Sequence, residues 1–229
     1  MKKITIAIDG FSSTGKSTLA KQLAKELGYV FVDTGAMYRA ITLFAMQIGY
    51  ISEAYFDKET LINALASIKL HFEFNTELGF AEMFLNNVNV ENEIRTLAVS
   101  NFVSKIAEVS QVRSKLVEQQ QEFGKNKGIV MDGRDIGTVV FPDAELKIFM
   151  TASAETRAQR RYDELLVKND KVTFEEVLEN VQKRDYIDTH RDDSPLVMAD
   201  DAIEIDNSYL NKEEQFKLVL ELVEEVLNS

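Results

Sequence analysis

A phosphate-binding pattern stands close to the start of the chain. Residues 10–18 read Gly-Phe-Ser-Ser-Thr-Gly-Lys-Ser-Thr and match G-x-x-x-x-G-K-[ST]. In such a loop the glycines let backbone N–H groups turn inward around a phosphate, and the lysine reaches the β- and γ-phosphates. Lys16 is therefore the expected phosphate-binding cation, and Ser17 is the expected Mg²⁺ ligand. The residues expected to hold a nucleoside triphosphate are Gly10, Phe11, Ser12, Ser13, Thr14, Gly15, Lys16, Ser17 and Thr18.

The nine arginines all lie between residues 39 and 191, although the chain carries a net charge of −12. Arginine has a planar guanidinium that binds phosphates and base edges through two parallel hydrogen bonds. Arg157, Arg160 and Arg161 stand at i, i+3 and i+4, so three positive charges share one helix face and repel one another without an anionic partner. We expect a triphosphate to be that partner. The alternative is a solvated helix face with weak surface ion pairs.

A second group of charges lies along a later helical pattern. Arg184, Asp188 and Arg191 stand at i, i+4 and i+7, which puts a carboxylate between two guanidiniums on one face. The spacing indicates either a second anion-binding group or a string of helix salt bridges that binds no ligand.

Alternating elements must position these residues. Short β-branched runs are followed by longer helical patterns, which is typical of a parallel sheet covered by helices. The first helix has Leu19, Leu23 and Leu27 at four-residue spacing and Gly28 as its stop signal, so it directly follows the phosphate-binding pattern. The expected strands are Ile4–Ile8, Tyr29–Asp33, Gly128–Asp132, Leu146–Met150 and Ala202–Asp206.

One stretch departs from this alternation and predicts a small antiparallel sheet. Turn residues at Asn75–Gly79 and Asn86-Asn87 separate three short runs of strand-forming residues. The expected strands of this insertion are Ile68–Phe74, Phe80–Leu85 and Val88–Val90. Further helices are expected at about Ile94–Val109, Val112–Phe123, Ala154–Val167, Phe174–His190 and from Asn211 onward.

Composition excludes several classes of protein. The 229 residues are 45% hydrophobic, which is enough to bury a sizeable core. The absence of Cys rules out disulfides and thiolate metal sites, and two histidines are too few for a multi-histidine metal cluster. The net charge of −12 disfavours binding to nucleic acid or to an anionic membrane. No apolar run is long enough for a signal peptide or a membrane span, so we expect a cytoplasmic protein.

Four longer motifs give the chain a family resemblance. They read DTGAMYR at 33–39, EIRT at 93–96, DGRDIGTVVFPDA at 132–144 and RDYIDTHR at 184–191. With these motifs, nearly the whole chain resembles bacterial cytidylate kinases. The resemblance implies one α/β P-loop kinase domain over residues 1–229, with a five-stranded parallel sheet flanked by helices. Its core would comprise about residues 1–60, 94–153 and 174–229, with a monophosphate-binding β insertion at about 61–93 and a mobile helical lid at about 154–173.

The resemblance also implies a role for each matching residue. Arg39 and Arg134 would hold the acceptor phosphate, and Arg184 with Asp188 would hold the sugar of CMP. Thr34, Arg113, Asp135 and Arg191 would surround the cytosine, while Arg157, Arg160 and Arg161 would be lid arginines that close on ATP. Asp132 would act near Mg²⁺, through a water molecule. The expected catalytic residues are Lys16, Asp132, Arg134, Arg157 and Arg161. The expected CMP-binding residues are Thr34, Tyr38, Arg39, Arg113, Asp132, Gly133, Arg134, Asp135, Arg184, Asp188 and Arg191.

The chain departs from the family pattern at four positions. Phe11, Ser13 and Ser17 stand where the family usually has Pro, Gly and Gly, and Thr34 stands where Ser is usual. Because of the first three, the family pattern does not predict the backbone conformation of the phosphate-binding loop, whereas Thr34 keeps the hydroxyl group of the usual Ser.

The implied reaction is the transfer of a phosphoryl group from ATP, with its Mg²⁺, to CMP or dCMP. Asp135 would select cytosine, because a carboxylate accepts from the N4 amine, whereas uracil has a carbonyl there. We expect a monomer with no nucleic-acid or membrane partner. Two alternatives stay open: a P-loop kinase for another small acceptor such as UMP, AMP or shikimate, and a nucleotide-binding regulatory module that hydrolyses ATP slowly.

Overall fold

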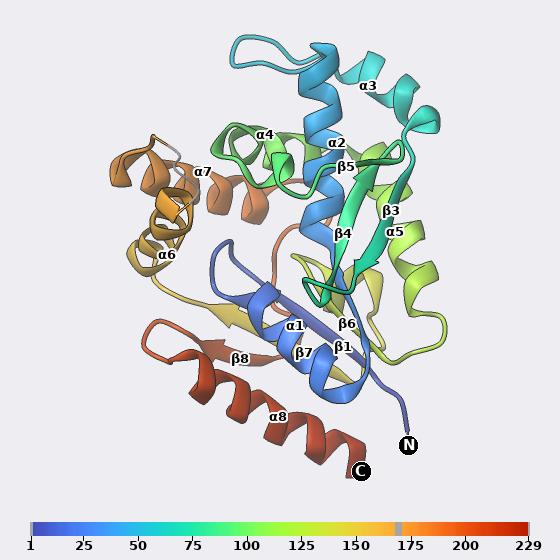
Figure 1. Cartoon of the computed structure of the whole chain (residues 1–229), viewed down its shortest axis with the longest axis vertical. Coiled ribbons are helices and arrows are strands. Elements are labelled where there is room, and N and C mark those ends of the chain that lie inside the picture. Colours follow the sequence, from blue (N-terminus) through green and yellow to red (C-terminus); the bar gives the residue numbers. More distant parts are fainter. Residues whose placement is uncertain (1, 168–170, 229) are drawn as a thin grey trace. The chain divides into compact units, whose positions relative to one another are not determined.

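The computed structural model describes residues 2–167 and 171–228 and divides into two compact units (Figure 1). The first unit comprises Met1–Asp33 and Gln119–Ser229, and the second comprises Thr34–Glu118. Residues 168–170, which belong to the expected lid, lie outside the described residues. In the part of the chain that is described, no helix combines the length and the apolar character that a bilayer span requires.

The first unit is built on a five-stranded sheet in the order β2-β6-β1-β7-β8. All neighbouring strands are parallel, which confirms the expected α/β class. Parallel strands end at one edge of the sheet, so residues that follow different strands are brought close together there. The strands are β1 (Thr5–Gly10), β2 (Val30–Asp33), β6 (Ile129–Asp132), β7 (Leu146–Thr151) and β8 (Ile203–Asp206).

Helices α1 (Lys16–Leu27) and α8 (Lys212–Asn228) cover one face of this sheet (Figure 1). Leu19 and Leu23 of α1 are fully buried in the same cluster as Val219 and Val223 of α8. Gly28 ends α1 with a φ of 65° and donates its N–H to Ala24, as its stop signal predicts. The unit also contains a π-helical turn at Ile136–Val140, α6 (Ala154–Val167) and α7 (Phe174–His190).

The second unit contains the expected antiparallel sheet, in the order β3-β4-β5. Asn86 and Asn87 both have positive φ, which suits the tight turn between β4 and β5. Helix α2 (Thr34–Ile48) lies in the buried cluster of this unit. The other elements are α3 (Lys58–Ala64), short 3₁₀ turns at Leu65–Ser67 and Glu93–Arg95, β3 (Leu70–Asn75), β4 (Phe80–Leu85), β5 (Val88–Asn89), α4 (Leu97–Ala107) and α5 (Ser110–Gly124), which continues into the first unit.

The structure corrects some of the sequence-based boundaries. The helix expected at Ile94–Val109 begins only at Leu97, because Thr96 has extended backbone angles and caps the helix by accepting a hydrogen bond from the Val99 N–H. The first strand continues to Gly10, where it still pairs with β7. Helices α2 and α3 were not among the expected elements, whereas α6 and α7 have their expected bounds.

Candidate active site

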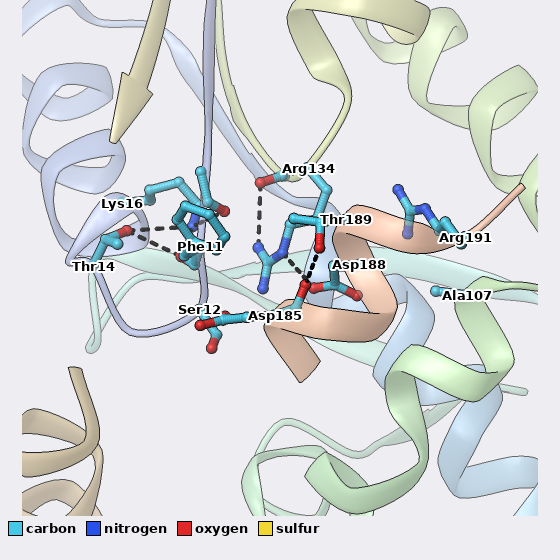
Figure 2. Close-up of polar contacts among 12 residues, drawn as sticks. Phe11, Ser12, Thr14, Lys16, Ala107, Arg134, Asp185, Asp188, Thr189 and Arg191 are labelled. Carbon is cyan, nitrogen blue, oxygen red and sulfur yellow. Dashed lines mark hydrogen bonds and ion pairs between the residues drawn. The ribbon is translucent and has the colours of Figure 1, made fainter. Parts of the chain in front are cut away.

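The phosphate-binding loop is folded around the side chain of Lys16, which is 5% exposed. Its Nζ donates to the carbonyl oxygens of Gly10 at 2.8 Å and Phe11 at 2.5 Å (Figure 2). Burial lowers the pKa of Lys16 well below its ordinary value, and the nearby guanidiniums of Arg134 and Arg184 add to the effect. The loop therefore holds a buried lysine whose positive charge a bound anion would stabilise.

Both glycines of the motif meet a steric requirement. A Cβ on Gly10 would lie 2.0 Å from the carbonyl oxygen of Met150 in the neighbouring strand, which no side chain tolerates. Gly15 has a φ of 98°, a backbone conformation that L side chains rarely adopt. The first glycine lets the loop leave the sheet, and the second lets it enter α1.

Ser17, in the first turn of α1, meets Asp132, the last residue of β6. The Ser17 hydroxyl donates to Oδ2 of Asp132 at 2.7 Å. Strand register places Asp33 opposite Asp132, and burial together with the Asp33 carboxylate raises the pKa of Asp132 to about 7, against the lowering effect of Lys16. A hydroxyl and a carboxylate are hard oxygen donors of the kind that Mg²⁺ prefers. Since the described residues hold no cluster of three or more His, Cys, Asp or Glu side chains suited to a metal, the remaining ligands would be phosphate and water oxygens.

The expected charge group on α7 forms around Asp188. Nε of Arg134 donates to Oδ2 of Asp188 at 2.8 Å (Figure 2). Although burial raises the pKa of Asp188, the guanidiniums of Arg134, Arg184 and Arg191 bring it below its ordinary value. Burial and the charge of Arg134 lower the pKa of Arg184 to about 10. The structure thus joins the DGRD motif to α7 through one shared carboxylate.

The three arginines of α6 reach three different partners. Arg157 forms two hydrogen bonds with the Asp185 carboxylate, at 3.0 and 2.6 Å, and its guanidinium lies 5.1 Å from the ring centre of Phe11. Arg160 donates to Thr14 O at 3.4 Å, and Arg161 pairs with Glu164 at 3.1 Å. The expected mutual repulsion is therefore offset by carboxylates and carbonyls of the protein itself.

The residues expected to bind CMP are divided between the two units. Asp132, Gly133, Arg134, Asp135, Arg184, Asp188 and Arg191 belong to the first unit, and Thr34, Tyr38, Arg39 and Arg113 belong to the second. Within the second unit, the Arg113 guanidinium lies 5.6 Å from the ring centre of Tyr38 and donates to Ala107 O at 3.2 Å. Arg39 donates to Ile94 O at 3.3 Å.

The comparison with known proteins identifies the family. The family model for cytidylate kinase matches residues 6–225. The chain belongs to the cytidylate kinase family. It is 77% identical to the cytidylate kinase of Flavobacterium johnsoniae over 99% of each chain, and 72% identical to that of Flavobacterium psychrophilum over 99% of this chain and 100% of the relative. An uncharacterized protein from Eubacterium ventriosum shares the fold, with a TM-score of 0.50, 11% identity, and coverage of 98% of this chain and 99% of that one.

The departures from the usual cytidylate kinase loop have structural consequences. Ser13 has a φ of 59°, so the chain keeps at this position the left-handed backbone that glycine favours. The Phe11 ring packs edge-on against Phe149, with centres 6.2 Å apart, and also contacts Arg157. Ser17 makes the hydroxyl contact to Asp132 that a glycine could not make.

Three buried or half-buried residues at this site were not singled out by the sequence. Asp9, directly before the loop, accepts hydrogen bonds from the N–H groups of Ile136 and Gly137 at 2.8 and 2.7 Å. Asp185 pairs with Arg157, and Asn207 contacts the loop from the end of β8. Asp185 lies within the RDYIDTHR motif, which was the available signal, whereas the contacts of Asp9 and Asn207 join distant parts of the sequence.

Proposed function

We propose that this chain transfers the γ-phosphoryl group of ATP to CMP, and to dCMP, giving ADP and CDP or dCDP. One observation carries the proposal: Lys16 and the Ser17–Asp132 pair stand together at the carboxyl edge of the parallel sheet, beside a group of buried arginines. That arrangement suits a triphosphate, its metal ion and an anionic acceptor. Membership of the cytidylate kinase family supports CMP as the acceptor.

The chemistry requires positioning and charge neutralisation rather than a general base. The attacking atom is an oxygen of the CMP phosphate, whose second pKa of about 6 leaves it largely ionised at neutral pH. Phosphoryl transfer then depends on in-line alignment and on cations that stabilise the charge of the transferred group. Lys16 would supply one such cation on the ATP side, and Arg134 would supply another toward the acceptor phosphate.

Magnesium would bind beside Ser17 and Asp132, and when bound it supplies charge neutralisation to the phosphate oxygens. Ser17 would offer its hydroxyl oxygen, and Asp132 would orient that hydroxyl and hold a water molecule of the ion. Asp132 is therefore assigned to metal binding rather than to proton transfer.

Selection of the base would depend on Asp135. This residue is 4% exposed and directly precedes the turn at Ile136–Val140. Its carboxylate would accept a hydrogen bond from the cytosine N4 amine. The guanidiniums of Arg113 and Arg191 would donate to O2 and N3 of the base. The remaining CMP-binding roles of Thr34, Tyr38, Arg39 and Arg113 stay predictions of the sequence motifs. Because free ATP and CMP are cytoplasmic metabolites, we expect the chain to work in the cytoplasm. We also expect it to be a monomer.

The decisive experiment measures ADP release with a panel of acceptors. ATP and Mg²⁺ are supplied with CMP, dCMP, UMP, AMP, shikimate or no acceptor. The expected result is ADP release that depends on CMP or dCMP and is far slower with the others. Equal ADP release without an acceptor, or a preference for shikimate or AMP, would refute the proposal.

A further inference from the structure

Asn207 links the phosphate-binding loop to the sheet. The residue directly follows β8 and is 3% exposed. Its Nδ2 donates to the carbonyl oxygen of Thr14 at 2.6 Å, and its backbone N–H donates to Thr151 O at 2.8 Å. The side chain therefore reaches the loop from a backbone position that β7 already fixes.

This hydrogen bond fixes the direction of one peptide group. A trans peptide is planar, and its C=O and N–H point in opposite directions. Because the Thr14 carbonyl points at the Asn207 amide, the N–H of Gly15 points away from it. The N–H groups of a G-x-x-x-x-G-K-[ST] loop are the donors that hold the phosphates. The orientation of the Gly15 donor thus depends on Asn207.

The orientation of the Asn207 amide is itself determined. Its Oδ1 is buried and accepts no hydrogen bond from residues 2–167 and 171–228. The opposite orientation would place that oxygen 2.6 Å from the Thr14 oxygen, where two acceptors repel. A Cβ on Gly15 would lie 3.1 Å from Nδ2, so the glycine also leaves room for this approach. The position requires a hydrogen-bond donor.

We propose that Asn207 is a positioning residue that holds the Gly15 N–H in its phosphate-binding direction and so sets the affinity for ATP. The inference rests on the proposed function in one respect, that this loop binds the phosphates of ATP. Arg160 contacts the same elements, donating to Thr14 O at 3.4 Å and to Asn207 O at 2.7 Å. If Arg160 turns toward a bound triphosphate, Asn207 keeps the Thr14 carbonyl in place.

The test compares Asn207→Asp and Asn207→Ala with the wild-type chain. The first keeps the size of the side chain but replaces the donor with an oxygen, and the second removes the side chain. Ser208→Ala is the matched control, because the Ser208 hydroxyl lies in the same connection but bonds to Asp206 and Ser153 instead of the loop. Calorimetric titration gives the ATP dissociation constant without acceptor, and steady-state kinetics gives KM for ATP and for CMP.

We expect both Asn207 variants to bind ATP about tenfold more weakly or worse, as the loss of a buried hydrogen bond predicts, with KM for CMP unchanged. Ser208→Ala should match the wild-type chain. Unchanged ATP affinity in either folded Asn207 variant would overturn the proposal, and so would an equal loss of ATP and CMP affinity, which a general loosening of the fold would produce. A wild-type chain that binds no ATP would instead refute the proposed function.

Discussion

The buried carboxylate of Asp9 makes the stability of the fold depend on pH. Asp9 is 5% exposed, and burial raises its pKa to about 6 from an ordinary 3.8, although the N–H groups of Gly137 and Ile136 lower it. Between these two values the folded chain binds more protons than the unfolded chain. Asp9 therefore stabilises the fold least at high pH, and its contribution becomes less favourable as the pH rises from about 4 to about 6.

The test replaces Asp9 with Asn and measures urea unfolding at a series of pH values. A pKa raised from 3.8 to about 6 lowers the free energy of unfolding by about 3 kcal/mol at any pH well above 6. From pH 4 to pH 7.5, the free energy of unfolding of the wild-type chain should therefore fall by roughly 2 kcal/mol more than that of Asp9→Asn. The amide of Asn accepts fewer N–H bonds than a carboxylate, but that loss does not change with pH. The comparison is therefore one of slopes rather than absolute stabilities.

Two results would contradict this reasoning. Parallel pH profiles in the two proteins would show that the Asp9 pKa is not raised in the folded chain. A wild-type stability that rises relative to Asp9→Asn as the pH rises would show that the two N–H bonds outweigh burial, and that the carboxylate stabilises the fold.

Four further predictions concern the proposed reaction. Lys16→Ala should abolish phosphoryl transfer without unfolding the chain, while Lys21→Ala on the same helix should not; equal turnover in the two variants would refute the assignment of the loop. Asp135→Asn should lose about 1–3 kcal/mol of transition-state binding for CMP and narrow the CMP/UMP ratio of kcat/KM, and an unchanged ratio would remove Asp135 from base selection. Arg161→Lys should lower kcat more than it raises KM for CMP, because lysine keeps the charge but not the planar fork. Hydrogen exchange over residues 154–173 should slow when an ATP analogue and CMP are both present, and unchanged exchange would argue against a lid.

The phosphate-binding loop could be predicted because its determinants are local. A β-branched run, two glycines, Lys16 and Ser17 follow one another within a few residues, and α1 continues with a regular leucine spacing. The sheet strands were found for a similar reason, since each is a short apolar run bounded by turn residues. The sequence did not predict the order of the strands in the sheet, which the structure shows.

Helix α2 escaped the sequence analysis because it lacks a polar face. Nine of its fifteen residues are buried, and Arg39 is its only charged residue. It also begins with Thr34 and Gly35, which have low helix propensity. Packing in the cluster of its own unit, rather than local preference, stabilises this helix.

The pairings of the site residues could not be predicted either, because they join distant parts of the chain. Arg157 and Asp185 are 28 residues apart, and Asp9 and Ile136 are 127 apart. The spacing of the α6 arginines showed that they share a helix side. It could not show that each long, flexible side chain binds a different partner, because the tertiary fold determines which partners lie within reach.

These pairings explain how an acidic chain can bind small anions. Burial together with neighbouring guanidiniums lowers the pKa of Lys16, so the site disfavours its own positive charge until an anion arrives. Asp185 and Asp188 already neutralise Arg157 and Arg134. At Arg157, which binds Asp185 through two hydrogen bonds, a phosphate could replace the carboxylate in the same two-pronged geometry, so the exchange would cost little desolvation beyond what the fold has already accepted. The whole chain carries a net charge of −12, so we expect it to repel an extended polyanion such as a nucleic acid.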